Sequence, residues 1–341
     1  MKTVNINSLS RVNAEYQNAL RALPAYQLVE VCSALGINVL DVAGEDIIIN
    51  KRRKGGVLRP YTPGLTPNQN QELIKFFESR LKPQLCYGSF EDNITNYIEK
   101  KVLSNNADEL DLKTKKHPLE FEIIRDAILA INEDIIFQLF FAERDNAGTT
   151  PATAFNGIYT TMDALVTAGE ISATIGNLVN TGEIAAPVDG DTSAYDRVVA
   201  FVKSAHPLLR AGECNLMISQ GAITNVRDAF RNKVKSFDYP TTAQVLERLK
   251  DDAGAPGLKF VTHECLGNGS KLTLIKPNMI DLGFHVADDK DFIQVRSISK
   301  DPNEVQFWAE LAIDTRIRDI HPKVFMTNEQ TSTSIALAGD Y

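Results

Sequence analysis

Hydrophobic residues recur at helical spacing through one long segment, residues 118–142. Large apolar side chains at steps of three and four form a single stripe: Phe121, Ile124, Ile128, Ile131, Ile135 and Leu139. Pro118 suits the first helical position, and Glu120 and Glu122 favour the positive N-terminal end of a helix. At about 1.5 Å per residue, such a helix spans roughly 37 Å. The pattern therefore predicts a strut nearly as wide as a small domain.

The part of the chain before this helix is less regular. Residues 9–35 predict one or two short helices, residues 46–49 a short strand, and residues 67–81 a further helix. Residues 50–70 are basic and then rich in Pro, Gly and Asn, which predicts an extended arm or loop. Residues 83–116 are polar and charged with few apolar positions, so they predict either a projecting hairpin or a flexible loop.

Short alternating elements follow the long helix. A short helix is expected over residues 155–166, and Ser193 with Asp196 resembles a capping box that opens a helix to about residue 209. Further helices and strands are predicted at 214–218, 220–235, 242–250, 258–263, 271–276, 279–286, 291–299 and 304–314. In the last of these, apolar residues alternate with polar ones, which is typical of a half-buried strand. We expect residues 170–285 to form a lobe inserted between the long helix and the final strands.

Composition narrows the range of functions. The chain has 341 residues with 43% hydrophobic content, enough for a sizeable core, and a net charge of -8, which argues against a general nucleic-acid-binding surface. One basic cluster stands out, namely Lys51, Arg52, Arg53 and Lys54. It is either a solvated loop tip or a patch that touches a neighbouring acidic subunit or packaged nucleic acid.

The cysteines and the hydropathy pattern point to a reducing compartment. Cys32, Cys86, Cys214 and Cys265 are far apart in the sequence, which disfavours a disulfide framework and a zinc site built on paired cysteines. The chain opens without an apolar run, so we expect no signal peptide. No stretch approaches the roughly 18 apolar residues that a membrane helix needs. We therefore expect a soluble protein made in a cytoplasm, without a membrane partner.

Candidate chemistry is sparse. His263 and Cys265 are two residues apart and would face the same side of a strand, but a zinc ion needs three or four ligands. Gly267 and Gly269 lack the rest of a dinucleotide fingerprint, because no predicted helix follows them. Paired acids such as Asp251 and Asp252 fall in turn-like segments, where a solvated face is the usual explanation.

A calcium loop is also disfavoured. Asp189, Asp191 and Ser193 imitate its first three ligand positions, but Ala194 replaces the glycine and Ala200 the glutamate that the motif requires. Helix capping explains these acids better. We therefore predict no catalytic residue, no cofactor-binding residue and no metal ligand, and no cofactor.

Several stretches in a fixed order resemble the major capsid proteins of tailed bacteriophages, in particular those of phages and prophages of Bacteroidetes-type hosts. They are His117-Pro-Leu-Glu-Phe-Glu-Ile-Ile-Arg-Asp-Ala, Phe140-Phe-Ala-Glu-Arg-Asp, Ala154-Phe-Asn-Gly-Ile-Tyr-Thr-Thr-Met-Asp-Ala-Leu, Leu208-Leu-Arg-Ala-Gly and Val305-Gln-Phe-Trp-Ala-Glu-Leu-Ala-Ile-Asp. Together they cover about residues 117–326, and the N-terminal third matches least.

The resemblance implies the α+β HK97-like capsid fold. On that basis we expect an N-terminal arm and short helices in 1–82, an extended loop in 83–116, and an axial domain in 170–285. Residues 117–169 and 286–341 would form the peripheral domain, with residues 118–142 as its spine helix. Some relatives crosslink a lysine of the extended loop to a neighbour's asparagine. Lys100, Lys101 and Lys113 are candidates by type, without a residue-by-residue match.

The resemblance also implies a structural function without enzymatic activity. The chain would self-assemble into the pentamers and hexamers of an icosahedral phage head that encloses double-stranded DNA without sequence specificity. Portal, scaffolding or decoration proteins would be further partners, and the protein would reside in the virion. Two alternatives stay open: an encapsulin-like compartment of the same fold that encloses cargo, and an unrecognised soluble α/β enzyme.

Overall fold

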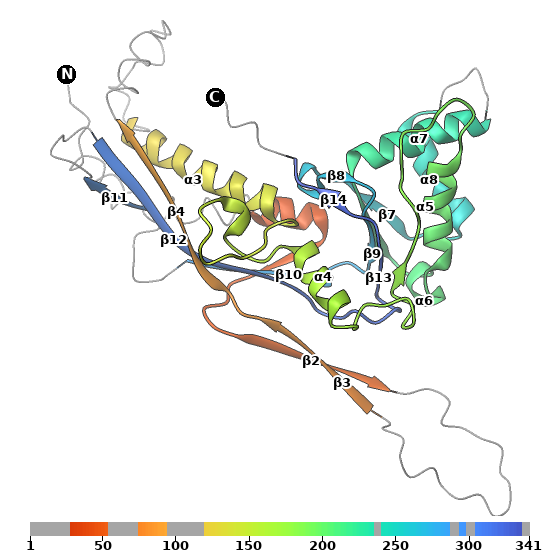
Figure 1. Ribbon diagram of the computed structural model, residues 1–341, viewed down its shortest axis with the longest axis horizontal. Helices are drawn as coiled ribbons and strands as arrows, with labels where there is room; N and C mark the ends of the chain where they lie inside the picture. Colours follow the sequence, from red (N-terminus) through yellow and green to blue (C-terminus); the bar gives the residue numbers. More distant parts are fainter. Residues whose placement is uncertain are drawn as a thin grey trace, which may run out of the picture.

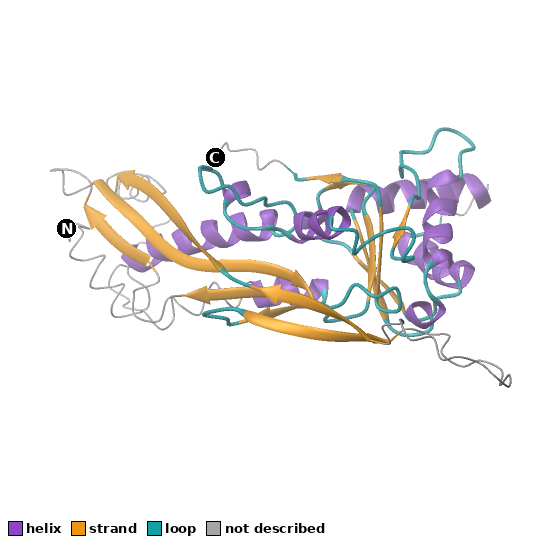
Figure 2. Ribbon diagram, turned by 60° about the horizontal axis from the view of Figure 1, so that its bottom comes forward, coloured by secondary structure: helices purple, strands orange, loops and turns teal. Residues whose placement is uncertain are grey.

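The computed structural model describes residues 28–53, 74–93, 119–234, 240–286, 293–297 and 304–335. Two lobes lie side by side, and a two-stranded ribbon projects from the first lobe (Figure 1). A long sheet and a long helix build the first lobe, and a second sheet lined by helices builds the other lobe (Figure 2).

The long sheet of the first lobe is organised around one strand, β12 (Glu304–Ile317). On one side β12 pairs antiparallel with β4 along ten residues of each strand, and on the other side it pairs with β11 and then β10. A short strand, β1, pairs parallel with β10 at the edge. The bounds are β1 (Ile37–Leu40), β4 (Gln84–Asn93), β10 (Ile280–Val286) and β11 (Ile293–Ser297).

The predicted long helix is present as α3 (Leu119–Gln138) and packs on one face of this sheet. Ile124, Ile128 and Ile135 of its apolar stripe are buried in the core of the first lobe. Gly88 of β4 allows this close approach, because an added Cβ would lie 3.0 Å from the side chain of Ile131. The helix ends a turn earlier than predicted, since residues 139–141 form a turn.

The second lobe has a five-stranded sheet in the order β5-β13-β9-β6-β7. Three helices cover one of its faces (Figure 1). The strands are β5 (Leu178–Val179), β6 (Cys214–Ile218), β7 (Leu258–Val261), β9 (Leu272–Ile275) and β13 (Phe325–Asn328), and the helices are α5 (Ser193–Ser204), α7 (Gln220–Val234) and α8 (Thr242–Ala253). The opposite face contacts α4 (Ile158–Thr167), where Thr273 approaches Met162.

Strand β6 lies between the two hydrophobic cores. Leu216 belongs to the core under the three helices, whereas Met217 belongs to the core of the first lobe. Because side chains alternate along a strand, a strand covered on both faces is apolar throughout. This explains why the run at 214–218 is continuous rather than alternating.

The projecting ribbon consists of β2 (Asp46–Arg53) and β3 (Ile74–Leu81), which pair antiparallel from Asp46↔Leu81 to Arg53↔Ile74. The predicted strand at 46–49 is therefore confirmed and extended. The predicted helix over 67–81 is wrong for its described part, 74–81. Phe77 and Leu81 face inward and Phe76 outward, which is a period of two that the adjacent pair Phe76–Phe77 obscures.

Two further expectations need correction. Residues 84–93, placed in an extended loop, form β4 inside the long sheet, while 94–116 lie outside the described residues. Strand β13 joins the second sheet, although 286–341 was assigned to the first lobe. Asn328, the polar residue at the end of β13, is buried. Its side chain is satisfied there, because the amide nitrogen donates to the Ser270 carbonyl and the amide oxygen accepts from the Leu272 N–H.

The remaining elements are short. The helix predicted from 193 to 209 is interrupted, because Pro207 starts a separate helix. The short elements are η1 (Pro151–Thr153), α6 (Pro207–Arg210), η2 (Glu264–Leu266), β8 (Asn268–Gly269) and β14 (Ser332–Thr333). Residues 28–35 are also helical. None of the helices in the described ranges combines the length and the apolar character needed to cross a membrane.

Candidate functional site

The residues singled out for metal chemistry have structural roles. The ring nitrogen Nδ1 of His263 accepts a hydrogen bond from the Cys265 N–H and lies 3.1 Å from the Cys265 thiol. The prediction that His263 lies on a strand is therefore wrong, because His263 caps η2. Within the described ranges, no three His, Cys, Asp or Glu side chains gather in a way that could hold a metal ion.

Asp191 also has a structural role, as an acceptor of hydrogen bonds at the start of α5. Its carboxylate accepts hydrogen bonds from the N–H and the hydroxyl of Ser193, at 2.8 and 3.0 Å. These bonds lower the pKa of Asp191 below its usual value. The capping box predicted for Ser193 and Asp196 is wrong, because Ser193 is the first residue of α5 and the residue before it, Thr192, makes no side-chain capping hydrogen bond.

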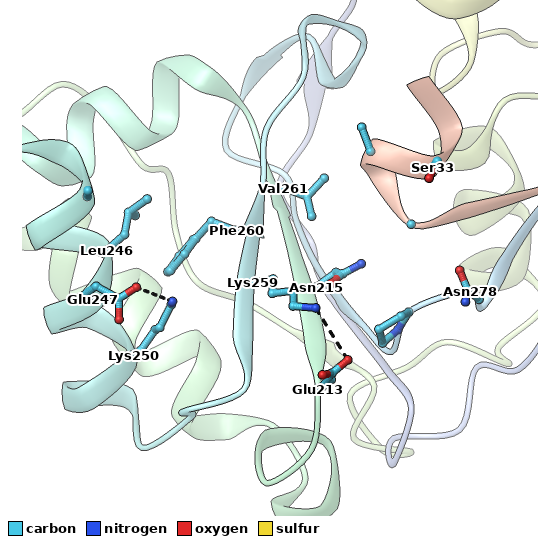
Figure 3. A pocket seen from close by; sticks show the side chains of 14 residues that line it. Ser33, Glu213, Asn215, Leu246, Glu247, Lys250, Lys259, Phe260, Val261 and Asn278 are labelled. Carbon is cyan, nitrogen blue, oxygen red and sulfur yellow. Dashed lines mark hydrogen bonds and ion pairs between the residues drawn. The ribbon is translucent and has the colours of Figure 1, made fainter. Parts of the chain in front are cut away.

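An open groove of 620 Å³ separates the end of the 28–35 helix from α8 and β7 (Figure 3). Its charged side chains face one another in two pairs: Lys250 with Glu247 at 2.6 Å, and Lys259 with Glu213 at 3.7 Å. These charges cancel locally. The groove therefore presents no concentrated charge that would select an ionic ligand.

The outward face of the β2–β3 ribbon carries four exposed large apolar side chains, each paired across the ribbon with a charged residue. Ile49 is 58% and Phe76 is 55% exposed, and Ile47 and Ile74 lie on the same face. Two-stranded hairpins are at best marginally stable alone in water. We refer to Ile47, Ile49, Ile74 and Phe76 as the ribbon face.

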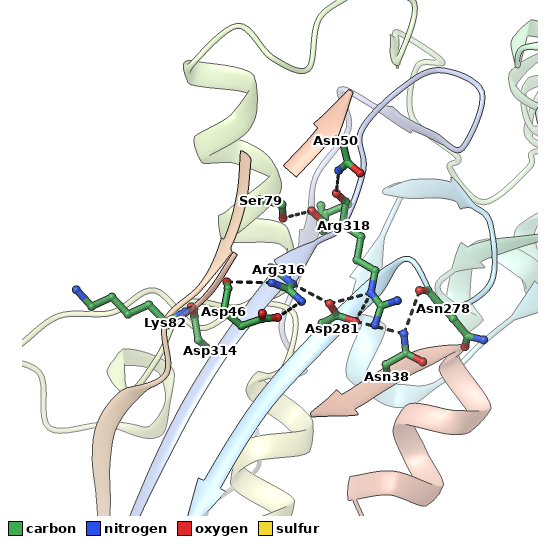
Figure 4. A network of polar contacts seen from close by, with 11 residues as sticks. Asn38, Asp46, Asn50, Ser79, Lys82, Asn278, Asp281, Asp314, Arg316 and Arg318 are labelled. Atoms are coloured by element: carbon green, nitrogen blue, oxygen red, sulfur yellow. Dashed lines mark hydrogen bonds and ion pairs between the residues drawn. The ribbon is translucent and has the colours of Figure 1, made fainter. Parts of the chain in front are cut away.

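The base of the ribbon is held by a buried ionic network (Figure 4). Arg316 of β12 is almost fully buried and donates to the carboxylates of Asp281 and Asp46, at 2.7 and 2.6 Å. Arg318 donates to the same Asp281 at 2.7 Å. Each buried charge thus has an opposite partner, which is the condition for retaining ions in a protein interior.

Neutral hydrogen bonds extend this network along the inner face of the ribbon. The Ser79 hydroxyl donates to the Ile317 carbonyl at 2.6 Å, and the Asn50 amide donates to the Arg318 carbonyl. Where β3 passes into β4, the Lys82 N–H donates to the Asp314 carboxylate at 2.8 Å. Burial raises the pKa of Asp314 above its usual value, and the hydrogen bonds and nearby arginines only partly oppose this. The direction of the ribbon is therefore fixed by polar contacts to β12.

A second apolar surface lies on the long sheet, on the face opposite α3. Leu85 and Tyr87 of β4 are each 64% exposed, and the Tyr87 ring stacks on Trp308 of β12 with 4.6 Å between centroids. We refer to Leu85, Tyr87 and Trp308 as the aromatic patch. The predictions from sequence missed both apolar surfaces and the network, although Arg316 and Arg318 near the end of a strongly alternating strand were a detectable signal.

The residues of the basic cluster are only partly described. Lys51 is exposed at the far part of β2, and Arg52 and Arg53 complete that strand. Lys54 lies outside the described residues, as do the crosslink candidates Lys100, Lys101 and Lys113.

Comparison with solved structures identifies the fold. A chain of the satellite phage P4 procapsid including size determination (Sid) protein matches with a TM-score of 0.54 and 13% identity, over 91% of this chain and 90% of that one. The capsid of Myoviridae phage XM1 matches with a TM-score of 0.49 and 12% identity, over 86% and 89%. A virus-like particle from Pyrococcus furiosus matches with a TM-score of 0.39 and 10% identity, over 92% and 100%.

Comparison of sequences alone gives nothing: no family model and no curated protein matches. The similarity to the P4 procapsid chain covers most of the protein, so this chain has the mixed α+β, HK97-type fold of phage major capsid proteins. The resemblance stated from the sequence is confirmed at the level of fold.

Proposed function

We propose that this chain is the structural subunit of an icosahedral phage head, which self-assembles into pentamers and hexamers around double-stranded DNA. The capsid fold supports this proposal across most of the chain. We further propose a phage or prophage of a Bacteroidetes-type host, which rests on the sequence stretches between residues 117 and 326.

The observation that carries the proposal is the ribbon face. Four large apolar side chains are exposed on a projecting two-stranded element whose base is nevertheless rigidly anchored by Arg316, Asp281 and Asp46. An apolar surface held out from the body indicates a contact with another molecule. In a shell, that molecule is a second copy of the same chain, and extended elements add contact area that a globular face cannot reach.

The domain roles follow from this proposal. We assign α3 to the spine, and the sheet with α5, α7 and α8 to the axial domain inserted near residues 170–285, which β13 completes. The β2–β3 ribbon takes the role of the extended loop that was first assigned to 83–116, because β4 occupies the long sheet. Residues before the 28–35 helix keep the role of an N-terminal arm.

The partners are copies of the chain itself, and we propose portal, scaffolding or decoration proteins as additional ones. DNA is enclosed without sequence specificity, which an acidic protein of net charge -8 allows. The protein is made in the host cytoplasm and resides in the virion. An encapsulin-like compartment is the second candidate, since it uses the same fold with a protein cargo.

Electron microscopy of the purified chain tests the function. We expect closed icosahedral particles, and particles from lysed host cells are expected to contain nuclease-protected DNA. Particles that hold protein cargo but never DNA would favour the compartment. A chain that stays a compact monomer at all concentrations and turns over a small molecule would overturn both shell functions.

A further inference from the structure

We propose that the groove beside β7 binds an extended peptide segment of a partner protein, which adds to the sheet of the second lobe as a further strand. This inference goes beyond the proposed shell function and does not depend on it. β7 ends the sheet order β5-β13-β9-β6-β7, and β6 is its only neighbour among the described strands. A strand at the edge of a sheet presents backbone N–H and C=O groups that can pair with another chain.

The groove reaches both faces of the sheet at the edge of β7. On one face, Phe260 packs against the core under the three helices, and on the other face Val261 packs against the core of the first lobe. α8 forms the wall on the Phe260 side, and the end of the 28–35 helix forms the wall on the Val261 side (Figure 3). A strand added beside β7 would therefore lie between two helices.

The two walls decide the kind of occupant. The β7 edge of a second copy carries the same two helices, which would collide with the walls of the groove. A single extended segment has no such helices and can enter between them. β7 has four residues, and a segment that matches it spans about 13 Å. The occupant is therefore a terminal or linker segment rather than the edge of another sheet.

A buried amide points into the groove. Asn215 of β6 lies opposite Lys259 of β7 and is 6% exposed, and its side chain is directed toward the end of the 28–35 helix (Figure 3). Within the described ranges, no group forms a hydrogen bond with this side-chain amide. Buried polar side chains in native proteins almost always have a partner. A peptide backbone would supply one, because an amide can donate to a carbonyl and accept from an N–H.

Both walls of the groove are fixed within the single subunit. On the first-lobe side, the Asn278 N–H donates to the Gly36 carbonyl at 3.1 Å, and the Asn38 amide donates to the Asn278 carbonyl at 3.0 Å. On the other side, a capping box of Thr241 and Gln244 fixes the start of α8. A preformed site loses less conformational freedom when it binds, so more of the interaction energy appears as affinity.

The lining selects uncharged, apolar peptide side chains. Successive side chains of an extended peptide point to opposite faces of the sheet. They would meet Leu246 and Phe260 on one side, and Ala34, Val261 and Pro277 on the other. The charged side chains of the groove already neutralise one another in two pairs, so a charged peptide residue finds no counterion there. Because a strand covered on both faces is apolar throughout, the ligand is a run of about four consecutive apolar residues.

The test measures the binding of a defined peptide to the full chain by fluorescence polarisation. The probe is a fluorescein-labelled peptide with a run of about four valines, flanked by glycine and lysine for solubility. A control peptide has proline in the middle of the run, which removes a backbone donor that strand pairing needs.

Three tryptophan variants of the full chain locate the site. Ala34→Trp and Ala243→Trp each fill the groove from one wall, at exposed helical positions. Ala200→Trp, at an exposed position of α5 outside the groove, is the matched control. Asn215→Leu removes the buried amide with little change in volume, and Asn215→Ala replaces it if circular dichroism shows that the leucine variant is not folded.

The wild type and Ala200→Trp are expected to bind the valine peptide equally, and about 10-fold or more tightly than the proline peptide. Each groove-filling variant should raise the Kd about 10-fold or more, and the Asn215 variant about 5-fold to 10-fold. Hydrogen exchange gives a readout specific to strand pairing. Fragments that contain β7 should exchange more slowly with the valine peptide than with the proline peptide.

Equal affinity for the two peptides, or equal affinity of the groove-filling variants and the control, would overturn the inference. Binding that appears only in a chain truncated after Ser334 would show that the chain's own end fills the groove, and would overturn the assignment to a partner. Each of these results leaves the shell function standing, because particle formation is tested separately by electron microscopy.

Discussion

The second lobe and the β2–β3 ribbon place their apolar side chains in opposite directions. In the second lobe, α5, α7 and α8 turn their apolar sides toward the sheet, and residues such as Leu249 and Tyr195 are fully buried. In the β2–β3 ribbon, Ile49 and Phe76 face outward and Ser79 and Asn50 face inward. The apolar residues of the first region are covered by its own chain, whereas those of the second region stay exposed in the single subunit. Apolar content therefore does not distinguish a core from a contact surface; the direction of the side chain does.

The largest effect is expected where the ribbon is anchored. Asp281→Ala removes the buried one of the two carboxylates that Arg316 binds and also the carboxylate that Arg318 binds, so the free energy of unfolding should fall by about 3–5 kcal/mol. Urea unfolding measures this change. Arg80→Ala removes an exposed charge pair of the ribbon and serves as control, with little change in stability. Equal losses in the two variants would contradict a buried anchor.

A core substitution in the second lobe comes next. Leu249→Ala deletes a fully buried side chain of α8 and should lower the free energy of unfolding by about 2–5 kcal/mol. Assembly is expected to survive, because the second lobe contributes no residue to the ribbon face. Sedimentation velocity below the unfolding temperature checks that the assembled mass is unchanged.

The ribbon face should show the reverse behaviour. Ile49→Ser changes a residue that is 58% exposed, so stability of the single subunit should stay within about 0.5 kcal/mol. Assembly should nevertheless weaken clearly at the same protein concentration, as measured by light scattering. A large loss of stability with intact assembly would mean that Ile49 belongs to the subunit's own core.

The smallest effect concerns pH at the ribbon junction. Because the pKa of Asp314 is raised in the folded state, the folded protein binds this proton more tightly than the unfolded chain. Its contribution to stability is therefore present at low pH and is lost as pH rises through the raised pKa. Asp314→Asn should remove that decline, as seen in urea unfolding between acidic and neutral pH. Asp126→Asn, at an exposed helix position, is the control.

Sequence patterns predicted the elements whose apolar residues face one core. Strand β12 shows a clean period of two, α3 shows a clean helical stripe, and α7 and α8 were found with nearly correct bounds. The order of stretches within 117–326 also led to the fold. In these elements one face is buried and the other is solvated, so the pattern alone carries the structure.

The ribbon and its anchor were not predictable in the same way. Ile47, Ile48 and Ile49 are consecutive, so β2 has apolar residues on both faces and shows no alternation. In β3, Phe76 and Phe77 point to opposite faces, but their spacing from Leu73 and Leu81 in the sequence also fits one side of a helix. The ionic network joins Asp46 to Arg316 across 270 positions, and no local pattern records a contact over that distance.

The position of β6 has a consequence for how the subunit loses its structure. Leu216 and Met217 of this one strand belong to different hydrophobic cores. Unfolding of either lobe would therefore expose apolar residues of the other lobe's core. Unfolding should then be a single cooperative transition, and a fragment cut between the lobes should not fold. In the proposed shell, each subunit would then lose its structure as one unit rather than lobe by lobe.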